Sequence, residues 1–259
     1  MDKIQEKLQE IRKNKRLGLM THVVVGYPSL RETIELVKLM ERSGVDFVEL
    51  QIPFSDPLAD GPTIMKACEA SLKTGIKVKD AFEIARKLSE QVKIPLLFMA
   101  YYNTVFKYGT KKFCQDAKKA GISGLIVPDI PIEEEENEHF MQYCNDVGLH
   151  HIRVISPAST DERLTKNSKV ANGFVYFTAR QGITGAKNTL DPKLISHLKK
   201  VRNVFKVPIA VGFGISKPEH VQAIKPYADI AIVGSAIIDI INSGKNYLKE
   251  VELFLQNLL

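Results

Sequence analysis

Short apolar runs alternate with amphipathic stretches along the whole chain of 259 residues. Each run is bounded by glycine, proline or small polar residues, which is typical of a buried parallel strand. Between the runs, apolar residues recur every three or four positions, which predicts helices with one apolar face. The predicted strands cover residues 19–25, 47–52, 95–100, 124–127, 150–155, 173–178, 208–212 and 230–233.

The stretches between these strands carry the start signals of helices. Ser29 and Ser216 are predicted N-caps, and the proline two residues after Ser216 suits a first helical turn. Before the first strand, Ile4, Leu8 and Ile11 fall on one helical face, so we expect this helix to cap one end of the fold. The predicted helices lie at 2–15, 29–42, 62–73, 78–91, 110–120, from 133, from 160, 191–202, from 216, from 235 and at the C-terminus.

Eight strands that alternate with helices favour a single (β/α)8 TIM barrel with an extra N-terminal helix, in one domain over residues 1–259. A doubly wound open sheet is the alternative. No G-x-G-x-x-G motif follows the first strand, which argues against the dinucleotide site typical of that fold. No linker or low-complexity segment indicates a second domain.

The composition indicates a globular protein without a nucleic-acid partner. Hydrophobic residues make up 44% of the chain and charged residues 25%, so a substantial core is expected. The net charge is +6, but the basic and acidic residues are mixed and form no long basic block. A mild positive charge also suits an anionic small substrate.

The cysteines and the N-terminus predict a cytoplasmic location. Cys68, Cys114 and Cys144 are isolated and odd in number, which favours reduced thiols. The first residues are charged and have no apolar signal core. No window approaches 18 consecutive apolar residues, so we expect no membrane span.

A carboxylate interrupts the second predicted strand. Glu49 lies among bulky apolar residues, where an ionised carboxylate is costly unless it is paired, protonated or functional. The loop beyond the strand carries Asp56 and Asp60. The alternative is structural: Glu49 satisfied by backbone amides, and the two aspartates serving as turn residues.

Glycines gather after the last three strands, at the barrel end where active sites lie. They let backbone amides approach a ligand, and two of the loops lead directly into helix starts, which attract anions. We therefore predict a phosphate site here, although the glycines could be turn residues alone. The residues concerned are Gly185, Gly212, Gly214, Gly234 and Ser235.

Apolar side chains near the same end could form a pocket for a flat ring. No His, Cys and acid cluster has the spacing of a metal site, so no metal is expected. No lysine stands on a strand in an obvious Schiff-base position, which weakens a covalent aldolase mechanism. The candidate pocket residues are Phe54, Ile64, Tyr101, Tyr176 and Phe213.

The string Pro53-Phe-Ser-Asp-Pro-Leu-Ala-Asp-Gly-Pro62 resembles the signature of the tryptophan synthase alpha chain family. The resemblance covers nearly the whole chain, and the P-F-S-D-P-x-A-D-G-P string is highly specific. Further segments fit the family pattern in order, namely 26–28, 101–103, 128–129, 180–185, 212–216 and 234–236.

The resemblance implies a barrel that cleaves indole-3-glycerol phosphate to indole and glyceraldehyde 3-phosphate without a cofactor of its own. It implies that Glu49 is the general acid/base and that Asp60 stabilises positive charge at the indole N–H. It further implies that Tyr176 lies near Glu49, that Thr184 and Arg180 belong to a closing loop, and that Gly185, Gly214, Gly234 and Ser235 hold the phosphate.

The resemblance also implies a partner, a pyridoxal-phosphate beta chain, in an alpha-beta-beta-alpha heterotetramer that passes indole between subunits. The loop 53–62 and the segment 101–106 would face it. This chain departs from the family pattern at Gln51, where glycine is usual, at His22, where an aromatic residue is expected, and at Ala179, which replaces a serine. A catalytically weak barrel that mainly binds and activates a beta chain is therefore the alternative.

Overall fold

The computed structural model describes residues 2–179, 183–184, 189–244 and 246–258. Within them, eight parallel strands close into a barrel, in the order β1-β2-β3-β4-β5-β6-β9-β10 and back to β1. The fold is thus a single (β/α)8 TIM barrel, as the sequence predicts. Its strands are β1 (Gly18–Val24), β2 (Phe47–Gln51), β3 (Leu96–Met99), β4 (Gly124–Ile126), β5 (His150–Ile155), β6 (Val175–Thr178), β9 (Ile209–Gly212) and β10 (Ile230–Val233).

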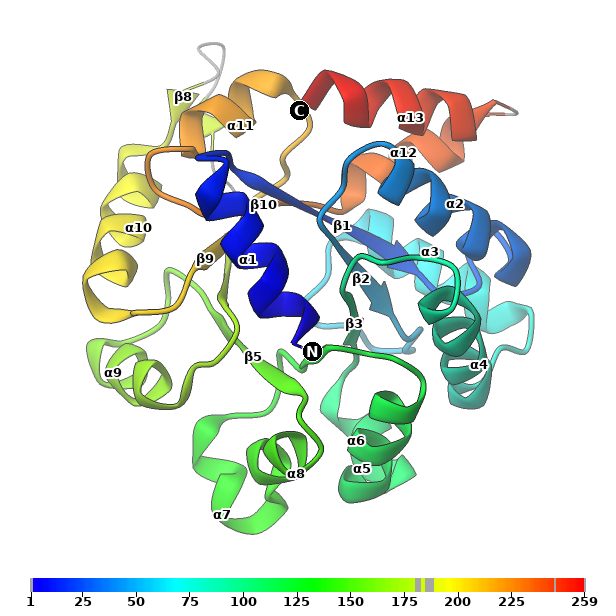
Figure 1. Ribbon diagram of the computed structural model, residues 1–259, viewed down its shortest axis with the longest axis horizontal. Helices are drawn as coiled ribbons and strands as arrows, with labels where there is room; N and C mark the ends of the chain where they lie inside the picture. The colour runs from blue at the N-terminus through cyan, green and yellow to red at the C-terminus, as the bar shows by residue number, and fades with distance from the viewer. Residues whose placement is uncertain (1, 180–182, 185–188, 245, 259) are drawn as a thin grey trace.

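Helices form an outer ring around the strands (Figure 1). Among the described residues, no helix is long and apolar enough to cross a lipid bilayer. The elements outside the barrel wall are α1 (Lys3–Lys13), α2 (Leu30–Arg42), α3 (Pro62–Lys73), α4 (Val78–Ser89), α5 (Tyr102–Tyr108), α6 (Thr110–Lys119), η1 (Ile132–Glu134), α7 (Glu135–Glu138), α8 (Phe140–Asp146), α9 (Asp161–Val170), α10 (Pro192–Val204), α11 (Pro218–Ile224), α12 (Ser235–Ser243) and α13 (Tyr247–Leu258).

The extra helix α1 lies across the barrel in Figure 1 and closes one end of it. Ile4, Leu8 and Ile11 are buried on its inner face, as their spacing predicts. They belong to the same cluster as inward-facing strand residues such as Met20 and Phe47. With this end filled by apolar side chains, a ligand site has room only at the opposite end, where the strands finish.

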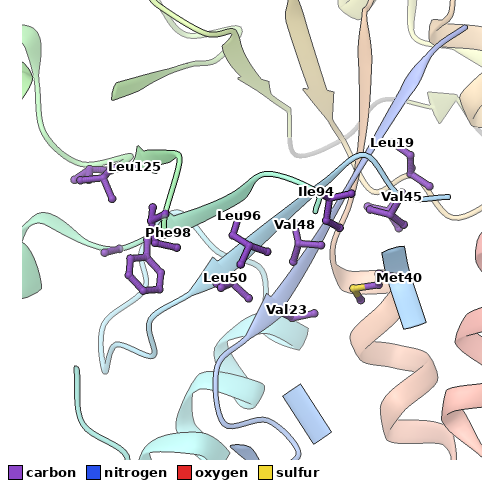
Figure 2. Close-up of a cluster of buried hydrophobic side chains, with 14 of the residues drawn as sticks. Leu19, Val23, Met40, Val45, Val48, Leu50, Ile94, Leu96, Phe98 and Leu125 are labelled. Atoms are coloured by element: carbon purple, nitrogen blue, oxygen red, sulfur yellow. The ribbon is translucent and has the colours of Figure 1, made fainter. Parts of the chain in front are cut away.

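A second apolar layer lies between the barrel wall and the helices. Figure 2 shows part of it: Val23 of β1 and Leu50 of β2 belong to the same buried cluster as Met40 of α2. Along each strand, successive side chains point alternately into this layer and into the barrel interior. Every residue of β1 and β2 is therefore buried, including the polar ones.

Several local predictions need correction. The segment after β3 is a helix, α5, which the sequence analysis did not predict. The helix predicted from residue 133 is interrupted: the acidic residues 133–136 fall in η1 and α7, and His139, with φ +51°, separates these from α8. After β6, the segment expected to be the closing loop contains a short strand, β7 (Ile183–Thr184). This strand pairs antiparallel with β8 (Thr189–Leu190).

Two predicted helix caps have different outcomes. Ser29 caps α2, and its hydroxyl accepts a hydrogen bond from the Glu32 N–H at 3.2 Å. Ser216 is not the cap of α11, which begins after Lys217. The reason is local, because the Ser216 N–H donates to Nδ1 of His220 at 3.2 Å and lies outside the helix.

Candidate active site

A cavity of about 480 Å³ opens at the carboxyl ends of the strands. Its wall combines apolar side chains with two carboxylates and a glycine-rich corner. The residues that line it are His22, Glu49, Ala59, Asp60, Gly61, Pro62, Ile64, Met99, Ile126, Pro128, Val154, Tyr176, Thr178, Ala179, Gly212, Phe213, Gly214, Ile232, Gly234 and Ser235.

Glu49 projects into this cavity from the middle of β2 and is only 2% exposed. Its register partner on β1 is His22, and Nδ1 of His22 lies 3.4 Å from Oε2 of Glu49. Tyr176 reaches the cavity from β6. Burial, together with the negative charges of Glu49 and Asp60, raises the pKa of Tyr176 well above its ordinary value of 10.0, so its hydroxyl remains a donor.

Asp60 reaches the same cavity from the loop between β2 and α3. One of its carboxylate oxygens, Oδ2, accepts hydrogen bonds from Nε2 of Gln51 at 2.6 Å and from the hydroxyl of Tyr101 at 2.9 Å. The Tyr101 hydroxyl in turn accepts from the Ala59 N–H at 3.0 Å, which ties the loop to the N-terminus of α5. Burial raises the pKa of Asp60 above 3.8, against the opposing effects of His22 and of these hydrogen bonds.

Glycines from the loops after β9 and β10 form the glycine-rich corner of the cavity. Gly214 has φ +86°, which only glycine adopts without strain. Gly234 precedes α12, and a Cβ at this position would lie 3.4 Å from Cβ of His22. The first amides of α12, from Ser235 on, have no partner within the helix and are open to an anion.

These groups can carry out proton transfer on a phosphorylated substrate that bears a flat ring. Two carboxylates in different surroundings can hold different protonation states, one as acid or base and one as a fixed charge. Apolar side chains such as Ile64 and Phe213 line the same cavity. Within the part of the chain that the structure describes, no three His, Cys, Asp or Glu residues gather as a metal site would require.

Comparison with known proteins assigns the chain to a family. The family model described as tryptophan synthase alpha chain matches residues 8–258. The chain belongs to the tryptophan synthase alpha chain family. It is therefore placed among the lyases of tryptophan biosynthesis.

Similar proteins cover the chain almost completely. The tryptophan synthase alpha chain of Desulfotalea psychrophila is 44% identical over 93% of this chain and 94% of its own length. That of Dehalococcoides mccartyi is 41% identical over 94% of each chain. A structure of tryptophan synthase subunit alpha from Legionella pneumophila superposes with a TM-score of 0.89 at 30% identity, covering 100% of this chain and 97% of that one.

The structure brings most of the candidate site residues, whether predicted from the sequence or implied by the resemblance, to one cavity. Glu49, Asp60, Ile64, Tyr176, Phe213, Gly214, Gly234 and Ser235 line it. Tyr101 donates a hydrogen bond to Asp60 but is not one of the residues that line the cavity. Of the loop residues, Thr184 lies in β7, while Arg180 and Gly185 lie outside the described residues.

Two polar contacts of the carboxylates were not predicted. His22 stands beside Glu49, and Gln51 donates to Asp60. A signal was present in the sequence, because residues two apart in a strand point to the same face. His22 therefore shares the inward face of its strand with Met20, and Glu49 and Gln51 share that of theirs with Phe47. What the sequence lacks is the register between β1 and β2, which sets His22 opposite Glu49.

Proposed function

We propose that this chain cleaves indole-3-glycerol phosphate to indole and glyceraldehyde 3-phosphate. The observation that carries the proposal is the placement of two buried carboxylates, Glu49 and Asp60, on one cavity with different partners. The glycine-rich corner supports it, because amides at Gly214, Gly234 and Ser235 can bind the phosphate. The apolar wall suits the indole ring.

Glu49 is the proton carrier in this scheme. As an acid it protonates C3 of the indole ring, and as a base it takes the proton of the glycerol hydroxyl next to the bond that breaks. The hydroxyl oxygen becomes the aldehyde oxygen, and the electrons of the broken C–C bond return to the ring. One proton enters and one leaves, so the reaction needs no redox cofactor or metal.

Asp60 serves as a fixed negative charge. Protonation at C3 makes the ring cationic, and a carboxylate near the ring N–H lowers the energy of that state. The hydrogen bonds from Gln51 and Tyr101 hold the carboxylate in place. Because its position is set before the substrate binds, no reorganisation is needed during the reaction.

A beta chain is the proposed partner, with pyridoxal phosphate bound only on that partner and an alpha-beta-beta-alpha assembly. Leu58, Met65 and Phe106 support this proposal. They are exposed apolar side chains, 84%, 43% and 57% accessible, on segments near the cavity end of the barrel. Such side chains are typical of a surface that a protein partner covers.

Indole release from indole-3-glycerol phosphate tests the proposal, measured with and without a beta chain. We expect cleavage by the chain alone and faster cleavage with the partner. Glu49→Gln removes the proton carrier and should lower kcat by about 100-fold or more. Glu69→Gln, an exposed glutamate on α3, is the matched control and should change kcat little.

No cleavage under any condition, with beta-chain activity still raised by this chain, would replace the lyase with the alternative of a regulatory subunit. Equal activity of wild type and Glu49→Gln would remove Glu49 from the mechanism.

A further inference from the structure

Each proposed catalytic carboxylate has a buried polar neighbour, and the reaction scheme gives no role to one of these neighbours, His22. His22 lies beside Glu49, with Nδ1 3.4 Å from Oε2, and Gln51 donates to Asp60 at 2.6 Å. The two partners come from adjacent strands, where His22 pairs with Glu49 and Val24 with Gln51. Glu49, His22, Gln51 and Asp60 therefore form one contiguous polar cluster, which we call the carboxylate cluster.

The carboxylate cluster is buried and has spare hydrogen-bonding capacity. His22 is 4% exposed and Gln51 is fully buried. Nε2 of His22, Oε2 of Glu49 and Oε1 of Gln51 have no hydrogen-bond partner among the described residues. Since an unpartnered buried polar atom is costly, three of them in one cluster, two on residues that line the cavity, indicate a functional arrangement and not a packing solution.

The charges around His22 favour its cationic form. Glu49 faces the ring from β2, and Asp60 faces it from the following loop. Raised pKa values keep Tyr176 and Cys68 neutral, and burial raises the pKa of Cys68 to about 12. On the other side, Gly234 brings no charge. Although burial alone would lower it, the pKa of His22 is raised above 6.5, chiefly by Glu49 and further by Asp60 and the Gln51 amide.

We propose that His22 is a positioning residue that, as an imidazolium, attracts the side chain of Glu49 and orients it in the free enzyme. Asp60, whose own position is set by the hydrogen bond from Gln51, adds a second negative charge near the ring. The inference deepens the proposed function, because it names what positions the proton carrier.

The competing interpretation is that His22 is a neutral ring that fills space in the barrel. Both interpretations predict that removing the ring disturbs packing. They differ in the charge of the ring, and in whether that charge responds to Glu49.

An NMR titration of the ring nitrogens in uniformly 15N-labelled protein decides between them without any substrate. The chain has six histidines, and His22 is assigned by the signals lost in His22→Phe, or in His22→Asn if the first variant does not fold. We expect the His22 ring to remain cationic above pH 6.5. In Glu49→Gln its midpoint should fall by about one pH unit or more, and in Gln51→Leu by less.

A His22 ring that is neutral at pH 6.5, or a midpoint that Glu49→Gln leaves unchanged, would overturn the inference. This result is independent of whether the chain cleaves indole-3-glycerol phosphate, so failure of the proposed function and failure of the inference are separable.

The pH profile of kcat/KM gives a second readout if the lyase is active. His22→Phe retains an aromatic ring of similar size but carries no charge. We expect roughly a tenfold loss of kcat/KM at neutral pH, and the difference from wild type should shrink as the pH rises and the wild-type ring loses its proton. A loss that is the same at every pH would indicate only a structural role and contradict the inference.

Discussion

At the scale of single residues, the site depends on giving two carboxylates unlike surroundings. Glu49 sits within the strand wall beside an imidazole, with one oxygen unpartnered. Asp60 sits on a loop, with two donors on one oxygen. Identical chemical groups thus have different partners and different freedom to move, which is the condition for assigning them different roles.

Replacing Asp60 by asparagine tests its role as a fixed charge. Asp60→Asn keeps the size of the side chain but removes the charge that would stabilise the cationic ring. We expect kcat to fall by roughly 100- to 1000-fold with a small change in KM, by analogy with the loss of one preorganised electrostatic contact. Steady-state indole release measures both parameters.

Asp56→Asn is the control, since Asp56 is exposed on the same loop and lies outside the cavity wall. A rise in KM with unchanged kcat in Asp60→Asn would contradict the assignment, because it would show binding of the ground state only.

At the scale of elements, strand register and α1 decide where the site can lie. The pairing of β1 with β2 brings His22 opposite Glu49, and α1 closes the other end of the barrel. Ile4 is fully buried there, and its Cδ1 would lie 3.3 Å from a Cβ placed on Gly124. The helix is therefore part of the core and not an appendage.

Shortening Ile4 should destabilise the fold without affecting catalysis. Ile4→Ala leaves a cavity under the barrel, and we expect the free energy of unfolding to fall by about 2–5 kcal/mol. Chemical denaturation measures the change. Gln9→Ala, an exposed position on the same helix, should cost less than about 0.5 kcal/mol. Loss of kcat in folded Ile4→Ala would show that α1 also shapes the active site.

At the scale of the whole molecule, buried histidines make stability depend on pH. His151 on β5 is 2% exposed, and its Nδ1 has no partner among the described residues. Burial, together with the positive charges of Arg153 and His150, lowers the pKa of His151 from 6.5 to about 4. The folded protein therefore holds this ring neutral at a pH where the unfolded chain protonates it.

The sign of the effect follows from proton linkage. Below pH 6.5 the unfolded state binds more protons than the folded state, so stability falls as the pH falls toward 4. From pH 7.5 to pH 5 we expect His151 to account for a loss of about 2 kcal/mol in the free energy of unfolding. Denaturation curves at both pH values measure the loss.

His151→Phe should reduce that loss, while His139→Asn, at an exposed position, should leave it unchanged. An equal loss in wild type and His151→Phe would contradict the prediction and place the acid sensitivity in other groups.

The sequence by itself determined the architecture, because alternation of apolar runs and amphipathic stretches is a local property that the barrel preserves. Strand β5 and strand β10 lie at their predicted bounds, and Glu49 and Asp60 reach the cavity as expected. The carboxylate in an apolar strand was recognisable because burying an ionised carboxylate among apolar side chains is costly.

Only the tertiary structure decided which side chains meet. Strand pairing joins residues far apart in the chain, and a shift of one residue would turn every side chain to the other face. The contacts of Glu49 with His22 and of Asp60 with Gln51 and Tyr101 follow from that pairing and from the fold of one loop. Short elements such as α5 also depend on packing, since a seven-residue helix has too few internal hydrogen bonds to be stable alone.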